Sequence, residues 1–183
     1  MNERPKTISE KTICKNAHFV CKEDVYQIAD GHETVYHYVV RSGTVVVIPT
    51  LPDGRIVMTR QYRYLQNKES IEFPSGSLRG EETASDAATR ELKEETGYTV
   101  DELIKIGEVE PSNGCMRNPT HIYLSFVSEQ GEQQLDETEL IEVVYRRPDE
   151  VDQMVERNDI WDSLTISAWA MARPRILHTE PYV

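Results

Sequence analysis

The amino-acid sequence predicts an α/β protein of the α+β type: an α/β/α sandwich with mixed sheets and an additional N-terminal layer of strands. Strand-like segments rich in aromatic and β-branched residues dominate the first half of the chain, and helical segments are interspersed with strands in the second half. A length of 183 residues suits one ordinary domain with a small appended element. We therefore expect residues 1–40 to form an N-terminal strand extension and residues 41–183 to form the main domain.

Strands are predicted along the first half from residue type and turn signals. Residues 44–49 form a short apolar run, which is typical of a buried strand. The Pro-Asp-Gly sequence at 52–54 favours a tight turn, so a hairpin is expected between this run and residues 55–64. Residues 75–76 are expected to lie in a loop. The predicted strands of this half cover residues 18–29, 34–40, 44–49, 55–64 and 70–74.

A helix is predicted between residues 83 and 97. Thr83 is a typical N-cap, and Asp86, three residues later, predicts a capping box. Gly97 is suited to the left-handed residue that ends a helix. Beyond this helix, the sequence predicts strands at 103–109, 121–127 and 140–145, and helices at 148–156 and 163–172, the last ending before Pro174.

The acidic residues of the 83–97 helix lie on the side that faces the protein. With about 100° per residue, the buried stripe consists of Ala84, Ala88 and Leu92. Glu91 and Glu95 fall on or beside this stripe and Glu94 flanks them, whereas a merely solvated face would place these acids opposite the alanines. The solvated side carries Asp86, Arg90 and Lys93.

Three carboxylates at positions i, i+3 and i+4 indicate a cation site. Like charges this close repel one another, and a divalent cation relieves the repulsion. Hard oxygen ligands suit Mg²⁺, with Mn²⁺ also possible, rather than zinc. The alternative is an internal salt-bridge network in which Arg90 or Arg63 neutralises the acids.

Residues 76–98 carry a longer pattern that includes these glutamates. They read GSLRGEETASDAATRELKEETGY and resemble the Nudix box, G-x5-E-x7-R-E-U-x-E-E-x-G-U, where U is a bulky apolar residue. The matching positions are Gly76, Glu82, Arg90, Glu91, Leu92, Glu94, Glu95, Gly97 and Tyr98. The chain is therefore similar to Nudix hydrolases, which cleave diphosphates linked to another moiety and use a divalent metal.

The resemblance implies roles for the residues of the box. Glu91, Glu94 and Glu95 would be metal ligands, helped by the backbone carbonyl of Ser75. Residues that would orient these ligands or shape the box are Gly76, Glu82, Arg90 and Gly97.

The flanks of the box resemble ADP-ribose pyrophosphatases and related nucleotide-sugar hydrolases. The segment Arg60-Gln61-Tyr62-Arg63 and the segment from Glu72 to Gly76 look like that group's RQYR and E-x-P-A-G stretches. Arg60, Arg63 and Glu72 would contact the substrate, and the alternative for the arginines is an exposed strand face. Residues 111–114 resemble the PSPG turn and residues 160–168 the closing-helix motif of the group.

An acidic loop supplies the candidates for the catalytic base. In the ADP-ribose group, a loop glutamate before an I-x-V strand takes this role, which points to Glu139, with Glu137 second; the alternative is a solvated loop. Residues 115–118 read Cys-Met-Arg-Asn where that group often carries Asp-Glu, which favours other nucleoside diphosphate sugars beside ADP-ribose.

Composition restricts the class of protein. The formal net charge is −12, and residues 1–70 hold ten of the 20 basic but only eight of the 32 acidic residues. This acidity disfavours nucleic-acid binding. The longest apolar run, residues 45–48, is too short for a membrane span, and residues 1–11 have no secretory apolar region. An odd count of three cysteines without a C-x-x-C pair favours the cytoplasm over a disulfide scaffold.

The sequence thus predicts an Mg²⁺-dependent Nudix pyrophosphatase. Its substrate would be ADP-ribose or a related nucleoside diphosphate sugar, and its products a nucleoside monophosphate and a sugar phosphate. Alternatives are hydrolysis of a nucleoside triphosphate or dinucleotide, and a non-catalytic domain that senses a nucleotide. The resemblance also implies a homodimer built by the N-terminal strands, with a small-molecule nucleotide as the ligand and neither nucleic acid nor membrane as partner.

Overall fold

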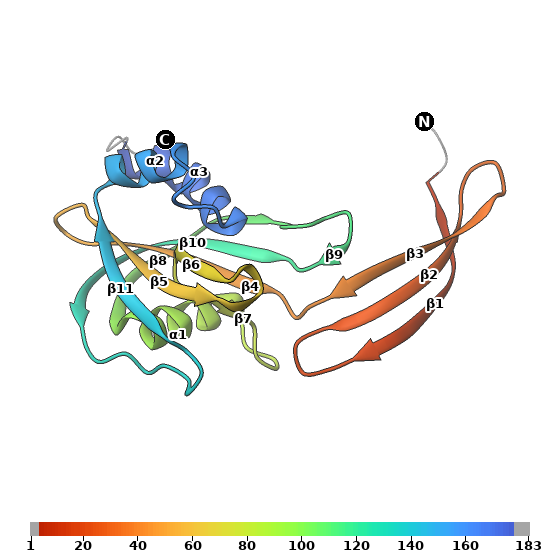
Figure 1. The fold of residues 1–183 in the computed structure, drawn as a ribbon, viewed down its shortest axis with the longest axis horizontal. Coiled ribbons are helices and arrows are strands. Elements are labelled where there is room, and N and C mark those ends of the chain that lie inside the picture. Colours follow the sequence, from red (N-terminus) through yellow and green to blue (C-terminus); the bar gives the residue numbers. More distant parts are fainter. Residues whose placement is uncertain (1–3, 178–183) are drawn as a thin grey trace. The chain divides into compact units, whose positions relative to one another are not determined.

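The computed structural model describes residues 4–177, which form two mixed sheets and three α-helices (Figure 1). By internal contacts these residues divide into two compact units. One contains residues 4–43 and 110–119, and the other contains residues 44–109 and 120–177. The expected boundary at residue 40 divides the chain into two continuous segments, so it does not group residues 110–119 with the N-terminal strands. None of the described helices has the length and apolar content needed to cross a membrane.

The first unit is a sheet with strand order β1-β2-β3-β9. Its strands are β1 (Lys6–Lys15), β2 (Val20–Gln27), β3 (Glu33–Val40) and β9 (Met116–Arg117). β1, β2 and β3 are antiparallel neighbours, and β9 pairs with β3 in parallel. The individual strand β1 was not predicted. Its residues are mostly polar and exposed along its whole length, so no apolar periodicity marks it, and pairing with β2 defines it.

The second unit is built on the larger sheet, in which the path β11-β5-β4-β10-β8 is joined by β6 beside β5 and β7 beside β4. Its strands are β4 (Thr44–Thr50), β5 (Ile56–Arg63), β6 (Lys68–Glu72), β7 (Ser75–Ser77), β8 (Tyr98–Val109), β10 (Thr120–Gln130) and β11 (Ile141–Arg146). The central pair β4–β10 is parallel and its neighbours are antiparallel. The predicted hairpin between β4 and β5 is confirmed. A short 3₁₀ helix, η1, covers Tyr64–Gln66.

Helices cover both faces of this sheet, as Figure 1 shows, so the predicted sandwich is confirmed. Alternate residues of β4 face opposite sides: Val45 and Val47 pack with Ala88 and Leu92 of α1 (Ala84–Thr96). Val46 and Ile48 pack in the other core cluster, with residues of α2 (Pro148–Glu156) and α3 (Ser163–Leu177). The central strand β4 is therefore fully buried, as its apolar run predicted.

The ends of two helices differ from the prediction. At the start of α1, the backbone N–H of Asp86 donates to Thr83 Oγ1, but the Asp86 carboxylate accepts from the Thr83 hydroxyl and not from its backbone, so the capping box is incomplete. Helix α3 continues through Pro174 to Leu177. Pro174 removes only the backbone N–H that would reach the carbonyl of residue 170, and the helix continues past it. In the same turn the Arg175 guanidinium donates to the Met171 carbonyl at 2.6 Å.

The prediction of a loop at residues 75–76 is also wrong, because these residues belong to strand β7. Ser75–Ser77 pairs antiparallel with Thr44–Val46 of β4. A strand of this length has no sequence periodicity of its own, so only its partner reveals it. The consequence is functional, since β7 brings the backbone of Ser75 and Gly76 against helix α1.

Candidate active site

Helix α1 carries the acidic residues of the candidate site on its inner side. Glu91 and Glu95 are buried together with the apolar residues of the same helix, and Glu94 is partly buried. The prediction that the glutamates face the protein is therefore confirmed. Thr83 caps the first turn, and Gly97, with φ of 75°, ends the helix in the left-handed conformation.

The helical wheel predicted that Arg90 lies on the solvated side of α1, and this prediction is wrong. Arg90 is 20% exposed, and its guanidinium donates to both carboxylate oxygens of Glu82, at 3.1 and 2.7 Å. Its Nη1 also donates to Glu91 Oε1 at 2.6 Å and to Glu94 Oε2 at 3.0 Å. The segment before the helix, which contains Glu82, folds back beside this part of α1, so a wheel drawn for the helix alone places Arg90 wrongly. The salt-bridge network weighed as an alternative is therefore present, with Arg90 as its centre.

The charges of this network shift the pKa values of its members. Hydrogen bonds from Arg90 hold the pKa of Glu82 below its usual range. Burial raises the pKa of Glu91, and the hydrogen bond from Arg90 opposes that shift. The hydrogen bond to Glu82 is in turn the largest cause that raises the pKa of Arg90. Arg90 therefore offsets part of the free-energy cost of placing carboxylates inside the protein.

Replacing Arg90 by Met is expected to destabilise the protein by about 3 kcal/mol, because three partly or fully buried carboxylates lose their cation while the aliphatic packing is kept. The matched control is Arg79→Met. The Arg79 side chain is 54% exposed and ion-pairs only with Glu94 among these acids. Its bond to Glu82 comes from the backbone, which Met keeps, so the substitution should cost less than about 1 kcal/mol. Urea denaturation in metal-free buffer measures both values. Equal, small losses would contradict the central role given to Arg90.

Glu95 has the most unusual environment of the acidic residues. Its side chain is 4% exposed, and Oε2 has no hydrogen-bond partner among the described residues. Burial and the charge of Glu91 raise the pKa of Glu95 well above its usual range, and a hydrogen bond with the backbone of Ser75 opposes this. A buried carboxylate oxygen without a partner is costly in a folded protein. Such an oxygen is suited to bind a cation.

Gly76 provides the space that the Glu91 side chain occupies. A Cβ atom at this position would overlap the carboxyl group of Glu91. Strand β7 can therefore pass directly beside the buried carboxylates only because residue 76 is glycine. This contact explains in physical terms why a glycine stands at the beginning of the box.

The oxygen donors of Ser75, Glu91, Glu94 and Glu95 have the chemistry of a Mg²⁺ or Mn²⁺ site. Within residues 4–177, however, no three acidic, histidine or cysteine side chains already converge as a cation site. Arg90 holds one oxygen of Glu91 and one of Glu94. Arg79 also donates to both oxygens of Glu94, at 3.4 and 3.3 Å. The second oxygen of Glu91 and Glu95 Oε2, which has no hydrogen-bond partner among residues 4–177, are the atoms that a cation could engage without displacing Arg79 or Arg90.

Of the two loop glutamates, the structure brings Glu139 to this site. The charge of Glu139 contributes to the raised pKa of Glu95, which requires the two carboxylates to lie within electrostatic reach. The Glu139 carboxylate accepts a hydrogen bond from the backbone of Asp136 at 3.0 Å. Glu137 is exposed, whereas Glu139 is partly buried.

The loop that carries Glu139 is tied to the end of helix α1. Gln133 Nε2 donates to the Glu95 carbonyl at 2.6 Å, and the backbone N–H groups of Gln134 and Gly131 donate to the carbonyls of Glu94 and Gly97. These carbonyls have no partner within the helix, so the loop satisfies them. The sequence analysis did not identify Gln133. The only signal was the general need of helix C-terminal carbonyls for donors.

Arg63 and Glu72 form a pair near Glu95, whereas Arg60 is engaged elsewhere. Arg63 Nε donates to Glu72 Oε1 at 2.7 Å, and this bond is the largest cause that raises the pKa of Arg63. The charge of Arg63 lowers the pKa of Glu95, so Arg63 lies within reach of the acids. Arg60 pairs with Glu142 of β11 on the exposed part of the sheet. This corresponds to the exposed-face alternative.

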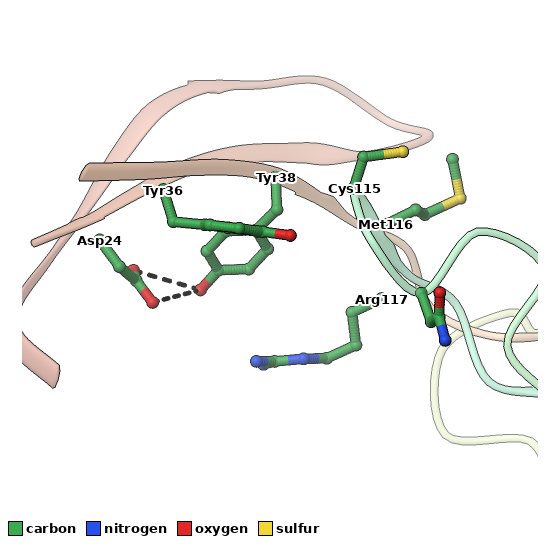
Figure 2. Close-up of a pocket in the computed structure, with 7 residues that line it drawn as sticks. Asp24, Tyr36, Tyr38, Cys115, Met116 and Arg117 are labelled. Atoms are coloured by element: carbon green, nitrogen blue, oxygen red, sulfur yellow. Dashed lines mark hydrogen bonds between the residues drawn. The ribbon is translucent and has the colours of Figure 1, made fainter. Parts of the chain in front are cut away.

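The residues that follow the 111–114 turn line a separate pocket of about 190 Å³ in the first unit (Figure 2). Tyr38 donates to Asp24 Oδ2 at 3.2 Å, and the Arg117 guanidinium lies 5.5 Å from the centre of the Tyr38 ring. Tyr36 and Cys115 contribute further to the lining. Aromatic rings, a cation and a carboxylate are thus gathered where the sequence departs from the ADP-ribose group.

Comparison with known proteins gives four findings. The model of the NUDIX domain family matches residues 40–168. The ADP-ribose pyrophosphatase of Bacillus subtilis (strain 168) is 33% identical over 173 residues, which cover 89% of this chain and 92% of that protein. The methanol dehydrogenase activator of Bacillus methanolicus is 29% identical over 165 residues, or 89% of each chain. A crystal structure of an ADP compounds hydrolase matches 96% of each chain with a TM-score of 0.83 at 19% identity, which supports the fold.

Proposed function

Because the chain belongs to the NUDIX family, we propose that it hydrolyses the diphosphate bond of ADP-ribose or a related nucleoside diphosphate sugar. The products are a nucleoside monophosphate and a sugar phosphate. The observation that carries the proposal is the buried Oε2 of Glu95, which lies in a complete Nudix box and has no hydrogen-bond partner in the part of the chain that the structure describes. The Ser75 backbone lies beside the Glu95 carboxylate. The similarity to a protein named ADP-ribose pyrophosphatase supports this class of substrate.

In this proposal, Mg²⁺ is the cofactor, and Mn²⁺ can replace it. The ligands are Glu91, Glu94 and Glu95, with the backbone carbonyl of Ser75. When bound, the cation polarises a phosphoryl oxygen and offsets negative charge between the acids and the diphosphate. A site made of carboxylates alone would repel that substrate.

The surrounding residues position the ligands and the substrate. Glu82 fixes Arg90, and Arg90 holds Glu91 and Glu94 in place. Arg63 remains partly exposed although it is paired with Glu72, so its remaining N–H groups are available to a phosphate oxygen. Glu72 is then a positioning residue for Arg63.

Glu139 is proposed as the general base. It accepts the proton of the water that attacks phosphorus and is held by the loop bonded to the end of α1. We expect Glu139→Gln to lower kcat by about 10²- to 10⁴-fold with little change in KM, since Gln keeps the shape but cannot accept the proton. Glu137→Gln is the control and should retain near-normal kcat. Comparable losses in both variants would argue against Glu139 as the base.

A substrate panel tests the function itself. Purified protein with Mg²⁺, and in parallel with Mn²⁺, is mixed with ADP-ribose, ADP-glucose, GDP-mannose and a nucleoside triphosphate. Release of a monophosphate from a nucleotide sugar is the expected result. Turnover of the triphosphate alone would favour the first alternative, and nucleotide binding without any release would favour a sensing domain.

We also propose that the protein is a cytoplasmic homodimer. The first unit leaves apolar residues of its sheet exposed, including Ile8, Ile13 and Val35, which supports an interface on this sheet. Its three cysteines are free, which supports a reducing compartment. Light scattering coupled to gel filtration measures the mass in solution, and Val35→Asp should shift a dimer toward the monomer.

A further inference from the structure

Two cysteines that are separated in sequence are direct neighbours across the first hairpin. Cys14 lies on β1 and Cys21 on β2, and the two residues are register partners. Directly opposed residues in an antiparallel pair have Cα atoms about 4.5–5.5 Å apart. Disulfide-linked residues have Cα atoms about 4.4–6.8 Å apart. The backbone of the hairpin therefore already satisfies the main geometric requirement for a disulfide.

The side chains are placed to react. Directly opposed residues of an antiparallel pair place their side chains on the same face of the sheet, and both cysteines line one cavity. The neighbouring Cys14 thiol raises the pKa of Cys21. The two thiol groups therefore lie side by side on the same face of the hairpin. Cys14 is exposed and Cys21 is partly buried, so an external reagent meets Cys14 first.

The surroundings of the pair form an accessible pocket. Cys14 and Cys21 line a cavity of about 340 Å³ together with the apolar side chains of Ile13 and Val39. Cys115 lies at the same cavity, but its sulfur contacts Ser112 Oγ at 3.1 Å, and its backbone is held in the 112–115 turn. Cys115 has no register partner among the cysteines of the described strands.

We propose that Cys14 and Cys21 form a dithiol–disulfide couple that exchanges with small-molecule disulfides such as glutathione disulfide. The Cys14 thiolate attacks one sulfur of the reagent, forming a mixed disulfide and releasing one thiolate. The Cys21 thiolate then attacks the Cys14 sulfur and releases the second thiolate. Two protein thiols are oxidised, the external disulfide is reduced to two thiolates, and the two protons released by the protein thiols pass through solvent to these thiolates, giving two thiols.

This couple is a modification site distinct from the hydrolytic chemistry, and it does not depend on the proposed substrate. The closed form would link β1 to β2 covalently across a short loop. The odd number of cysteines, which argues against a structural disulfide scaffold, is compatible with a reversible pair and a third, separate thiol.

The test treats the reduced full-length protein with glutathione disulfide and quenches samples by alkylation. Trypsin cleaves after Lys11, Lys15 and Lys22, so Cys14 and Cys21 fall on separate peptides, residues 12–15 and 16–22. The expected product is these two peptides joined by a disulfide, with an intact mass lower by two hydrogen atoms. Cys115→Ser should give the same product.

Two variants isolate the steps. Cys21→Ser should accumulate a stable glutathione adduct on Cys14, and Cys14→Ser should give no linked peptides. The proposal is overturned if the wild-type protein accumulates the Cys14 adduct without linked peptides, or if the linkage contains Cys115. Because mass is measured and not turnover, this outcome is independent of whether the nucleotide substrate is correctly assigned.

Discussion

Replacing Glu95 by Gln is expected to remove nearly all hydrolytic activity while leaving the metal-free protein at least as stable as the wild type. Turnover should fall by about 10³-fold, which corresponds to about 4 kcal/mol of lost transition-state stabilisation. The substitution keeps the shape of a side chain that is only 4% exposed, so packing with α1 and β7 is retained. It replaces the negatively charged carboxylate, which we assign to cation binding, by a neutral amide.

The stability part of this prediction follows from the raised pKa of Glu95. The pKa of Glu95 is higher in the folded than in the unfolded protein, so the protonated carboxyl favours folding. This contribution to the free energy of unfolding is fully present below the unfolded pKa, which is about 4.3. It is lost as the pH rises through the folded pKa, since ionisation then opposes folding. At neutral pH, Gln removes this penalty. Melting temperatures in chelator should therefore be equal or higher in the variant.

A divalent cation reverses this pH dependence in the wild-type protein. The cation binds the ionised carboxylate, so the rise in melting temperature on adding Mg²⁺ should grow with pH across the same window. Glu95→Gln should show almost no such rise, and Glu137→Gln should behave as the wild type does. A normal Mg²⁺ shift together with normal turnover in Glu95→Gln would refute the assignment of Glu95 as a metal ligand.

Replacing Gly76 by Ala is expected to impair the site by a purely steric route. The added Cβ would overlap the Glu91 carboxyl group, which Arg90 holds in place. A displaced carboxylate of this kind should lower turnover by about 10²-fold, the scale of a misplacement of about 1 Å in an active site. The side chain end can move, so the loss in stability should be smaller, about 1 kcal/mol.

Gly114→Ala is the matched control for this substitution. A Cβ at Gly114 meets open space, and its φ is not in the left-handed region. We expect its stability to change by less than about 0.5 kcal/mol. Steady-state kinetics and urea denaturation of both variants separate the two effects. Full turnover in Gly76→Ala would show that Glu91 need not lie against β7.

Local sequence was sufficient for the helix that carries the site. Thr83 and Gly97 define its ends because capping depends on backbone groups within one turn. The burial of Glu91 and Glu95 followed from the helical period, which relates each side chain to the apolar stripe of the same helix. The Nudix box could be read directly because its residues are contiguous.

Side-chain partners could not be predicted in this way. Arg90 was placed in solvent because a helical wheel contains no other segment, and the residues that pair with it include Glu82 from outside the helix. Strand β7 was missed because three residues show no period, and β1 because its polar residues carry no apolar alternation. Pairing with a distant strand defines both elements.

The sequence by itself therefore determined the family, the fold class and the residues that can supply oxygen ligands. Only the tertiary structure decided that Glu95 Oε2 has no hydrogen-bond partner among the described residues, that the charge of Glu139 acts on Glu95, and that Cys14 is the register partner of Cys21. The physical reason is range. Backbone dihedrals, caps and periodicity act within a few residues, whereas burial, ion pairing and strand register depend on segments that meet only when the chain folds.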